Sequence, residues 1–564
     1  MKSKKVTAES VWDEFNRDCS FKASLNLYET VEGNENFYIG KQWEGVQSNG
    51  LPTPVFNFIK RIILYVVAST STDNLKMNAS ALSSSSAEGL QISMSKLTQI
   101  INAQFEALFE QNKLGKQSRE FMRNAAVDGD ACIYSWFDAE AETGQAAKGT
   151  IRTELLENTR IGFGNPNNRD VQTQPYILIS RREMVEEVVE EAKAWGGEPD
   201  GIISDTDETN NRFDAMTEGK VTTVTRFWKE NGEVWAIKTA GKSIVRPKWN
   251  TRMSLYPITW LNWDYVQNCY HGQAAVTGLI PNQIFVNKMF AMVMMSLMTT
   301  AYPKIVYDKT RVQRWDSGIG KAIPVNGGDV SNVAKAIDPA TISPQVAQFI
   351  ELAISLTKEF MGATDAALGD TRPDNTSAII ALQKASSVPM ELTKQNFFQC
   401  LEDLGRIWLD QMRAYYGVRY VELPLSEQEK QAEMMAGRVP NDEPVPTPFD
   451  FGLLDKVPLS IKLDVGGSAY WSEIAQMNTL DNLLMNGQIN VVDYLERVPN
   501  GYISNQAELI AQLRERMGMA QQPVQAGAVG DEVLDMPNGA GYGELQRAIN
   551  NTGMEGMDLS QIQI

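Results

Sequence analysis

The stretch IFVNKMFAMVMMSLMTTA, residues 284–301, decides the fold of this 564-residue chain. It belongs to a helix that we predict over residues 280–300, with apolar side chains around nearly its whole circumference. A helix that is apolar all round must be enclosed on every side. Only about 13 uncharged residues follow Asn287 and Lys288, fewer than the ~20 that a bilayer-spanning helix needs. We therefore expect an enclosed helix and no membrane contact.

A second helix is predicted over residues 344–361, with Pro344 in its first turn and an apolar stripe at spacings of 3 and 4. Between the two helices, residues 301–343 read as a small α/β insertion with a strand at 304–307. We call the two helices the stalk and the insertion the tip. Because the stalk helices are too short to make a core of their own, neighbouring copies of the chain could enclose them. The residues expected to pack there are Phe290, Met294, Met298, Phe349 and Leu356.

The rest of the chain predicts a multi-domain α+β protein. Apolar periodicity indicates helices over 9–40, 56–69, 90–128, 472–485, 491–497 and 505–517. A long helix over 376–416 should be kinked by Pro389. Residues rich in β-branched and aromatic side chains predict strands at 132–137, 149–155, 176–180, 221–229, 234–239 and 459–465. Residues 435–458 read as a proline-rich linker and residues from 521 onward as a flexible tail.

The charge balance argues against a protein that grips nucleic acid through a broad basic face. Lysine and arginine number 52 and aspartate and glutamate 70, so the net charge is −18. The most acidic stretch, 183–208, is interpreted as a solvated helix with a loop. A metal site there would be the alternative, but the stretch contains nothing like an EF-hand loop.

The residues that usually carry catalysis are few. The four cysteines lie far apart and His271 is the single histidine, so a zinc site, a disulfide framework and a histidine-dependent triad are all disfavoured. We expect His271 to be a surface or interface residue in a turn. The best phosphate-loop candidate, 317–322, lacks both the upstream glycine and the Ser or Thr after Lys321 that a Walker loop needs. The sequence therefore predicts no catalytic, cofactor-binding or metal-binding residue and no enzyme.

Several motifs resemble the portal proteins of tailed bacteriophages. The stretch NFYIGKQW at 36–43, followed by PVFN at 54–57, is similar to the opening of many portals. The order of helix, small insertion, helix, Gly/Asp loop and long helix is similar as well. Near the end, DVGGSAYWSE at 464–473 is followed by LDNLL at 480–484 and YLERVP at 494–499. The resemblance spans about residues 9 to 515.

This resemblance implies a ring, generally of twelve subunits, at one vertex of the capsid. It implies a wing (1–279), two stem helices (280–300 and 344–361) around a clip (301–343), a tunnel loop (362–377), a long kinked helix returning to the wing (378–465) and a crown (466–520), ahead of the tail (521–564). Double-stranded DNA would pass through the ring during packaging and ejection. The implied partners are further copies of the chain, the terminase large subunit, a tail adaptor, the major capsid protein and a scaffold. The ring would reside in the virion, after assembly in the host cytoplasm.

Two regions are expected to make functional contacts. The tunnel loop would present mixed charge to DNA through Asp365, Asp370, Arg372, Asp374 and Asn375, unless it is a plain connector. The clip would dock the motor and the adaptor through Lys309, Arg311, Arg314, Trp315 and Lys321, unless it is a solvated surface with Trp315 in its own small core. The alternative functions are a metal-dependent enzyme acting on nucleic acid or nucleotides, and another structural component of a virion or secretion machine.

Overall fold

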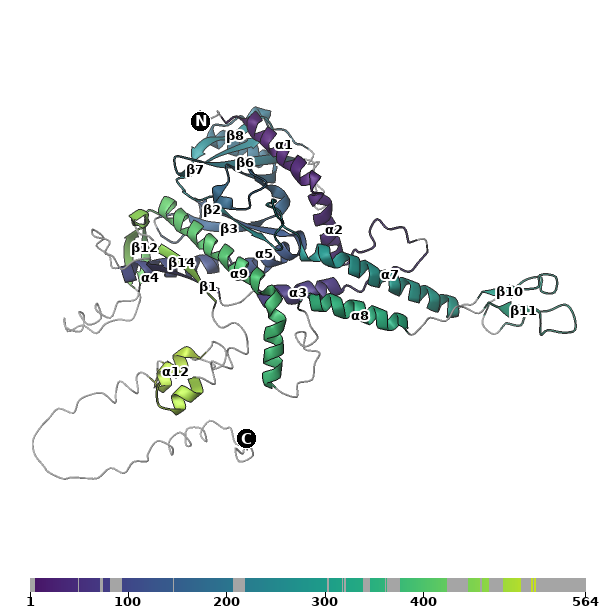
Figure 1. Cartoon of the computed structure of the whole chain (residues 1–564). Helices are drawn as coiled ribbons and strands as arrows, with labels where there is room; N and C mark the ends of the chain where they lie inside the picture. The colour runs from purple at the N-terminus through teal and green to yellow at the C-terminus, as the bar shows by residue number, and fades with distance from the viewer. Residues whose placement is uncertain are drawn as a thin grey trace, which may run out of the picture. The chain divides into compact units, whose positions relative to one another are not determined.

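The computed structural model describes residues 6–48, 50–70, 75–81, 94–145, 147–205, 219–301, 304–316, 318, 321–337, 345–360, 362, 376–423, 445–456, 459–465, 480–498, 509–510 and 512–513. The chain divides into two compact units, residues 1–472 and 473–564, which are described separately. Helices and strands are mixed along the chain, so the protein is α+β, as the sequence predicts (Figure 1).

Two antiparallel sheets form the middle of the first unit. The larger sheet is a meander in which strands adjacent in sequence pair with each other: β4 (Ile161–Phe163), β5 (Ile177–Met184), β6 (Lys220–Glu230), β7 (Glu233–Ala240) and β8 (Ser243–Asn250). Asn231 and Gly232 both have positive φ, the conformation that the tight turn between β6 and β7 requires. The smaller sheet has the order β3 (Thr150–Leu156), β2 (Asp130–Asp138), β9 (Ile258–Asn262). Side chains of both sheets meet in one aromatic core, which includes Phe163, Phe227, Tyr256, Trp260 and Tyr270.

Helices cover both sheets. On the larger sheet, α1 (Ala8–Ser24) buries Val11 and Phe15, while α6 (Val185–Trp195) packs beside β8. The largest apolar core lies on the other side of the smaller sheet, where Trp408 of α9 (Thr376–Tyr415) is fully buried. The other elements of this core include α3 (Phe58–Thr70), α4 (Met94–Gln111), α5 (Leu114–Asp128), β1 (Leu75–Ala81), η4 (Phe451–Lys456) and β14 (Leu459–Val465), which pairs with β1.

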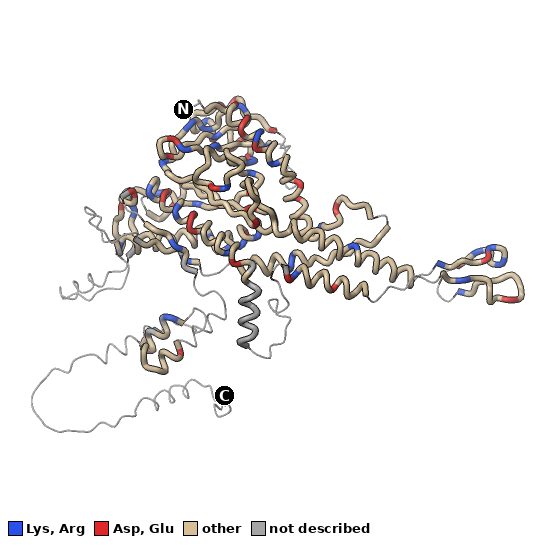
Figure 2. The backbone as a smooth tube through the Cα atoms, in the orientation of Figure 1, with Lys and Arg blue, Asp and Glu red and all other residues tan. Residues whose placement is uncertain are grey.

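The stalk is formed by α7 (Ala275–Ala301) and α8 (Gln345–Phe360), which run side by side away from the sheets (Figure 1). Its base contacts α2 (Leu27–Ile39) and α3. The tip lies at the far end of the stalk and contains the paired strands β10 (Ile305–Tyr307) and β11 (Ala334–Ala336). Charged residues gather over the sheets and at the tip, whereas few lie along the stalk (Figure 2).

The second unit is described over a short part of its length. Residues 480–485 are helical, and α12 (Val491–Arg497) buries Val492 and Leu495. Tyr494 donates a hydrogen bond to Asp481 at 2.6 Å, which ties α12 to the helical turn before it. The predicted helix at 491–497 is confirmed. The predicted helices at 472–485 and 505–517 lie mainly outside the described residues, as does the tail from 521.

Two predicted helices were wrong in detail. The helix predicted over 90–128 is two helices, α4 and α5, separated at Lys113, whose φ is 51°. The helix over 9–40 is α1 and α2, separated at Asn26 with a φ of 52°. A left-handed residue cannot continue a right-handed helix, so each break changes the chain's direction.

The predicted linker at 435–458 contains a strand. β13 (Val445–Asp450) pairs with β12 (Val418–Leu423) and buries Phe449, and Phe451 is buried directly after it. Pro446 and Pro448 are tolerated because β13 has one neighbouring strand, so its outer edge needs no ladder hydrogen bonds. The tip was predicted as α/β, but its described residues form strands and turns without a helix.

A buried carboxyl group at the end of α5 should make stability depend on pH. Burial raises the pKa of Asp128 to about 7, and Arg123 opposes this shift only partly. An unfolded aspartate has a pKa of about 3.9, so the native state binds this proton more tightly and loses stability as pH rises from about 4 to 7.

We therefore expect Asp128→Asn to stabilise the fold more at pH 8 than at pH 5.5, by about 1–2 kcal/mol in the free energy of unfolding. Urea unfolding at the two pH values measures this difference. As a control, Glu120→Gln on the same helix should change stability equally at both pH values, because the Glu120 side chain is 51% exposed. An equal gain from Asp128→Asn at both pH values would contradict the prediction.

Candidate functional site

The stalk presents large apolar side chains to solvent. Phe349 is 60% exposed on α8 and Leu297 is 58% exposed on α7. The exposed positions on α8 are spaced by 3 and 4 residues, so they form one stripe. The full set is Phe285, Met292, Met294, Leu297 and Met298 on α7 and Phe349, Leu352 and Leu356 on α8. In the part of the chain that the structure describes, the stalk therefore keeps much of its apolar surface exposed, although its composition predicts a fully enclosed helix.

The predicted stalk-packing residues divide into two groups. Phe290 is half-buried and stacks on Phe56, with 4.0 Å between ring centroids. The other four, Met294, Met298, Phe349 and Leu356, are exposed. The length and composition of α7 alone would allow it to cross a bilayer, and 17% of its most apolar 18-residue window is buried. A large apolar surface of this kind marks an interaction site.

The base of the stalk is held by a buried pair of amide side chains. Gln283 and Asn287 lie one turn apart on α7, are 0% and 2% exposed, and are hydrogen-bonded to each other at 3.0 Å. Asn287 donates to the side-chain oxygen of Gln42 at 2.6 Å, and Gln283 donates to the carbonyl of Phe56 at 2.8 Å. These bonds attach the segment between α2 and α3 to the stalk. We call this group the amide clamp.

The amide clamp explains the motif at 36–57. Gly40 ends α2 with a φ of 95°, which turns Gln42 back toward α7. Trp43 donates through its ring nitrogen to the carbonyl of Pro54 at 2.8 Å, so the two ends of the 43–54 segment are joined. Asn57 donates to the carbonyl of Tyr38 at 2.9 Å and accepts from the Lys60 amide, capping α3. The sequence identified this motif as a resemblance but gave no structural role for it.

The tip uses part of its predicted docking cluster for its own structure. Arg311 donates to the carbonyls of Asn326 and Asp329, and Trp315 stacks on Tyr307 with 5.3 Å between ring centroids. Lys321 forms an ion pair with Asp316 at 3.0 Å, and its hydrogen bond lowers the pKa of that carboxyl group. Val312 and Val333 are buried and form a small core. Lys309 and Arg314 are exposed, so these two are the members of the cluster most available to a partner.

The predicted channel residues Asp365, Asp370, Arg372, Asp374 and Asn375 lie outside the described residues. The same is true of residues 466–479, which contain most of the DVGGSAYWSE motif. The structure therefore tests neither prediction. On either side of the predicted tunnel loop, α8 ends at Phe360 and α9 begins at Thr376, which confirms the two predicted helices that flank it.

His271 is buried, so the expectation of a surface or interface histidine was wrong. Its Nδ1 lies 2.7 Å from a carboxylate oxygen of Asp130, and both side chains are at most 3% exposed. The other carboxylate oxygen accepts from the Gly272 amide and from Asn262, each at 2.7 Å. The turn at 268–272 folds back over the aromatic core, where the His271 ring stacks on Tyr270. This geometry indicates a structural histidine that fixes a turn against β2.

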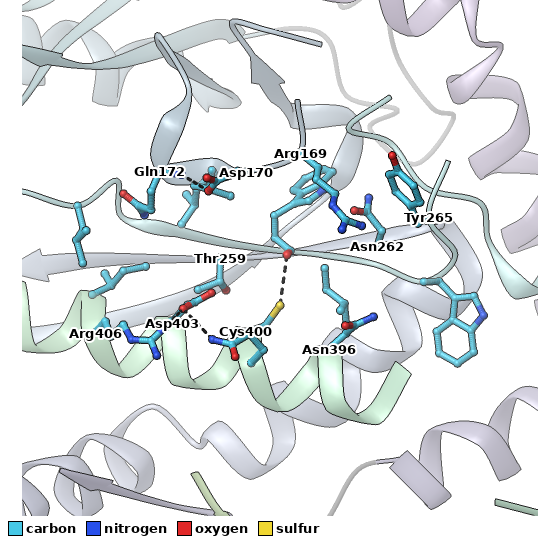
Figure 3. A pocket seen from close by; sticks show the side chains of 18 residues that line it. Arg169, Asp170, Gln172, Thr259, Asn262, Tyr265, Asn396, Cys400, Asp403 and Arg406 are labelled. Atoms are coloured by element: carbon cyan, nitrogen blue, oxygen red, sulfur yellow. Dashed lines mark hydrogen bonds and ion pairs between the residues drawn. The ribbon is translucent and has the colours of Figure 1, made fainter. Parts of the chain in front are cut away.

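A pocket of about 470 Å³ lies between β9, the segment 169–172 and α9 (Figure 3). Cys400 donates its thiol to the carbonyl of Trp260 at 3.3 Å, and burial raises the pKa of the thiol. Asp403 is paired with Arg406, and burial raises the pKa of its carboxyl group. A protonated thiol is a poor nucleophile, and the residues that line this pocket include no histidine or lysine to serve as a base. Cys400 therefore lacks the thiolate character of a catalytic nucleophile.

The described residues contain no group of three or more His, Cys, Asp or Glu side chains placed to hold a metal ion. Up to residue 205, where the described part of the acidic stretch ends, it forms α6 and a following loop, as predicted. Lys238 forms ion pairs with both Glu183 and Glu191, each at 2.7 Å. All four cysteines are free, and Cys132 and Cys400 are buried. No observation in this part of the chain favours the alternative of a metal-dependent enzyme.

Comparison with known proteins gives one match. Residues 116–421, more than half of the chain, match the family model described as phage P22-like portal protein. This span includes both stalk helices, the tip and the whole of α9. No curated protein matches the chain.

The amide clamp can be tested by removing one of its partners. Asn287→Leu would leave the buried side-chain oxygen of Gln42 without its donor, so we expect a loss of about 2–3 kcal/mol in stability and faster proteolysis within 43–57. The double variant Gln42→Leu/Asn287→Leu should lose less than the sum of the two single variants, because the side-chain oxygen of Gln42 is removed together with its donor. Lys288→Leu, at the exposed neighbouring position, is the control and should change stability little. Strictly additive losses would show that the two side chains are not coupled.

Proposed function

The chain belongs to the phage P22-like portal proteins, and from this premise we propose that it forms a ring of about twelve copies at one capsid vertex. The exposed apolar stripe of the stalk is the observation that carries this proposal. Each of these side chains is roughly half-exposed in one chain, so enclosure by neighbouring stalks would contribute roughly 1 kcal/mol per side chain. A closed ring gives every stalk two neighbours and leaves no unpaired face.

The ring would serve as the conduit for genome packaging and ejection. With a net charge of −18 per chain, the wall of the conduit repels phosphates overall. Tight phosphate contacts would slow a moving duplex, whereas a like-charged wall leaves it hydrated and mobile. We propose that residues 362–377 form the tunnel loop, with Arg372 as the one basic contact in each copy amid Asp365, Asp370 and Asp374.

The tip would be the clip, which binds the terminase large subunit during packaging and the tail adaptor afterwards. Its position at the far end of the stalk, away from the sheets, supports this assignment. The exposed Lys309 and Arg314 would make the contacts, while Arg311, Trp315 and Lys321 hold the tip in shape. The wing would face the major capsid protein and, during assembly in the host cytoplasm, a scaffold.

Ring formation should depend on the exposed stalk stripe. We expect Leu297→Asp and Phe349→Asp to fold normally as single chains, because both side chains are already mostly exposed, but to prevent ring closure. Mass photometry and thermal melting of the purified protein measure both properties. Ile203→Asp is the matched control, since Ile203 is 74% exposed but lies outside the stalk. Intact rings from both stalk variants would show that this stripe is not the assembly surface.

Partner docking should depend on the exposed bases of the tip. Lys309→Glu/Arg314→Glu should leave ring mass and melting temperature unchanged and weaken binding to the terminase large subunit or the adaptor by at least tenfold, through charge reversal at the contact. Surface plasmon resonance with immobilised rings measures the binding. Lys242→Glu in the wing is the control, because the Lys242 side chain is 80% exposed. Wild-type affinity of the double variant would move the docking site away from these residues.

A further inference from the structure

A second pocket lies between the two sheets of the first unit. Its volume is about 620 Å³, and β2, β5, β7, β8, α6 and the end of α9 supply its walls. The walls carry aromatic side chains, among them Tyr134, Trp136, Trp195 and Trp249, together with the guanidinium group of Arg246. Aromatic walls around one charged group are typical of a binding site.

Arg246 is held rigidly in this pocket by two indole rings. Its guanidinium carbon lies 3.7 Å from the ring centroid of Trp195 and 4.1 Å from that of Trp249. Stacking on both faces leaves only the edge of the guanidinium, where its N–H donors lie, for hydrogen bonding. Among the described residues, Arg246 has no hydrogen bond or ion pair, and its Nε is buried without an acceptor.

Two other stacked cations in the same sheet have a carboxylate partner. Arg226 lies over Tyr176 and pairs with Glu14 at 2.6 Å. Lys248, two residues from Arg246 on β8, lies 4.2 Å from the Trp235 centroid and pairs with Glu230 at 2.5 Å. The fold thus pairs these two cations internally, whereas Arg246 lines the pocket without an ion-pair partner within 4 Å among the described residues.

Most of the other charged side chains that line the pocket lie in ion pairs. Lys238 lies 2.7 Å from both Glu183 and Glu191, and Arg181 pairs with Glu154. Because the two glutamates border the same pocket, a doubly charged phosphate would be repelled by them more strongly than a carboxylate. The planar fork of an arginine also matches the two oxygens of one carboxylate. The indole walls suit an apolar or aromatic residue beside that carboxylate.

We propose that the Arg246 pocket binds the carboxylate of an acidic side chain, carried beside an aromatic residue on a second polypeptide. This proposal does not depend on ring formation or on DNA passage, because it rests on the Arg246 pocket alone. The partner would insert its acidic side chain between the sheets and pair with Arg246, as Glu14 pairs with Arg226.

The test uses the full-length protein and two peptides, acetyl-Phe-Glu-Phe-amide and its uncharged counterpart acetyl-Phe-Gln-Phe-amide. Saturation-transfer NMR measures both dissociation constants. The glutamate peptide should bind at least tenfold more tightly, and Arg246→Gln should abolish that difference. Trp195→Ala removes one wall at a position that is 54% exposed, so it should weaken binding at least threefold while melting near the wild-type temperature. Inorganic phosphate at equal concentration should not displace the peptide.

Lys248→Gln is the matched control, because it removes a stacked cation from the same strand outside the pocket and should leave binding unchanged. Equal affinity for the two peptides, or unchanged binding by Arg246→Gln, would overturn the proposal and assign Arg246 to packing alone. Displacement by phosphate would overturn the choice of a carboxylate. If Trp195→Ala loses binding and also melts at a much lower temperature, Arg246→Lys is the variant that tests the proposal in its place. It keeps the charge and should retain only part of the affinity.

Discussion

The structure depends on one constraint, which is that two apolar helices project from a well-packed body and need cover that a single chain does not supply. Gln283 and Asn287 fix where the stalk leaves the body, because their buried amides bond to Gln42 and to the carbonyl of Phe56. Beyond that clamp Phe290 still packs against Phe56, but several large apolar side chains of both helices stay exposed in the part of the chain that the structure describes. Apolar surface of this extent is costly in water, so the stalk favours association over a free monomer.

The sequence predicted the elements whose pattern is local. Alternation and 3.6-residue periodicity depend only on residues close together in the sequence. They therefore predicted both stalk helices and the strands at 132–137, 221–229 and 234–239. The sequence missed features that distant residues determine. Lys113 and Asn26 break helices because they adopt the left-handed conformation, and no glycine at these positions indicates the break in the sequence. Similarly, β13 is stabilised by pairing with β12, which lies earlier in the chain.

The candidate sites also divide into local features, which the sequence predicts, and contacts between distant residues, which it does not. The apolar surface of the two stalk helices could be predicted from the local sequence, but its exposure in the single chain could not. His271 and Asp130 are 141 residues apart, and Arg246 and Trp195 come from different elements. No spacing in the sequence brings these pairs together. The cluster at the tip was predicted from composition alone. Composition does not show that Arg311 and Trp315 make contacts within the tip. Nor does it show that Lys309 and Arg314 are exposed.

The central claim is that copies of this chain enclose one another's stalks in a closed ring, and the mass and symmetry of the assembled protein test it most directly. Native mass spectrometry with negative-stain imaging down the symmetry axis should show a ring of about 12 × 62.8 ≈ 750 kDa with an axial channel. A stable monomer of 62.8 kDa at micromolar concentration and low salt, with its stalk still exposed to solvent, would contradict the account.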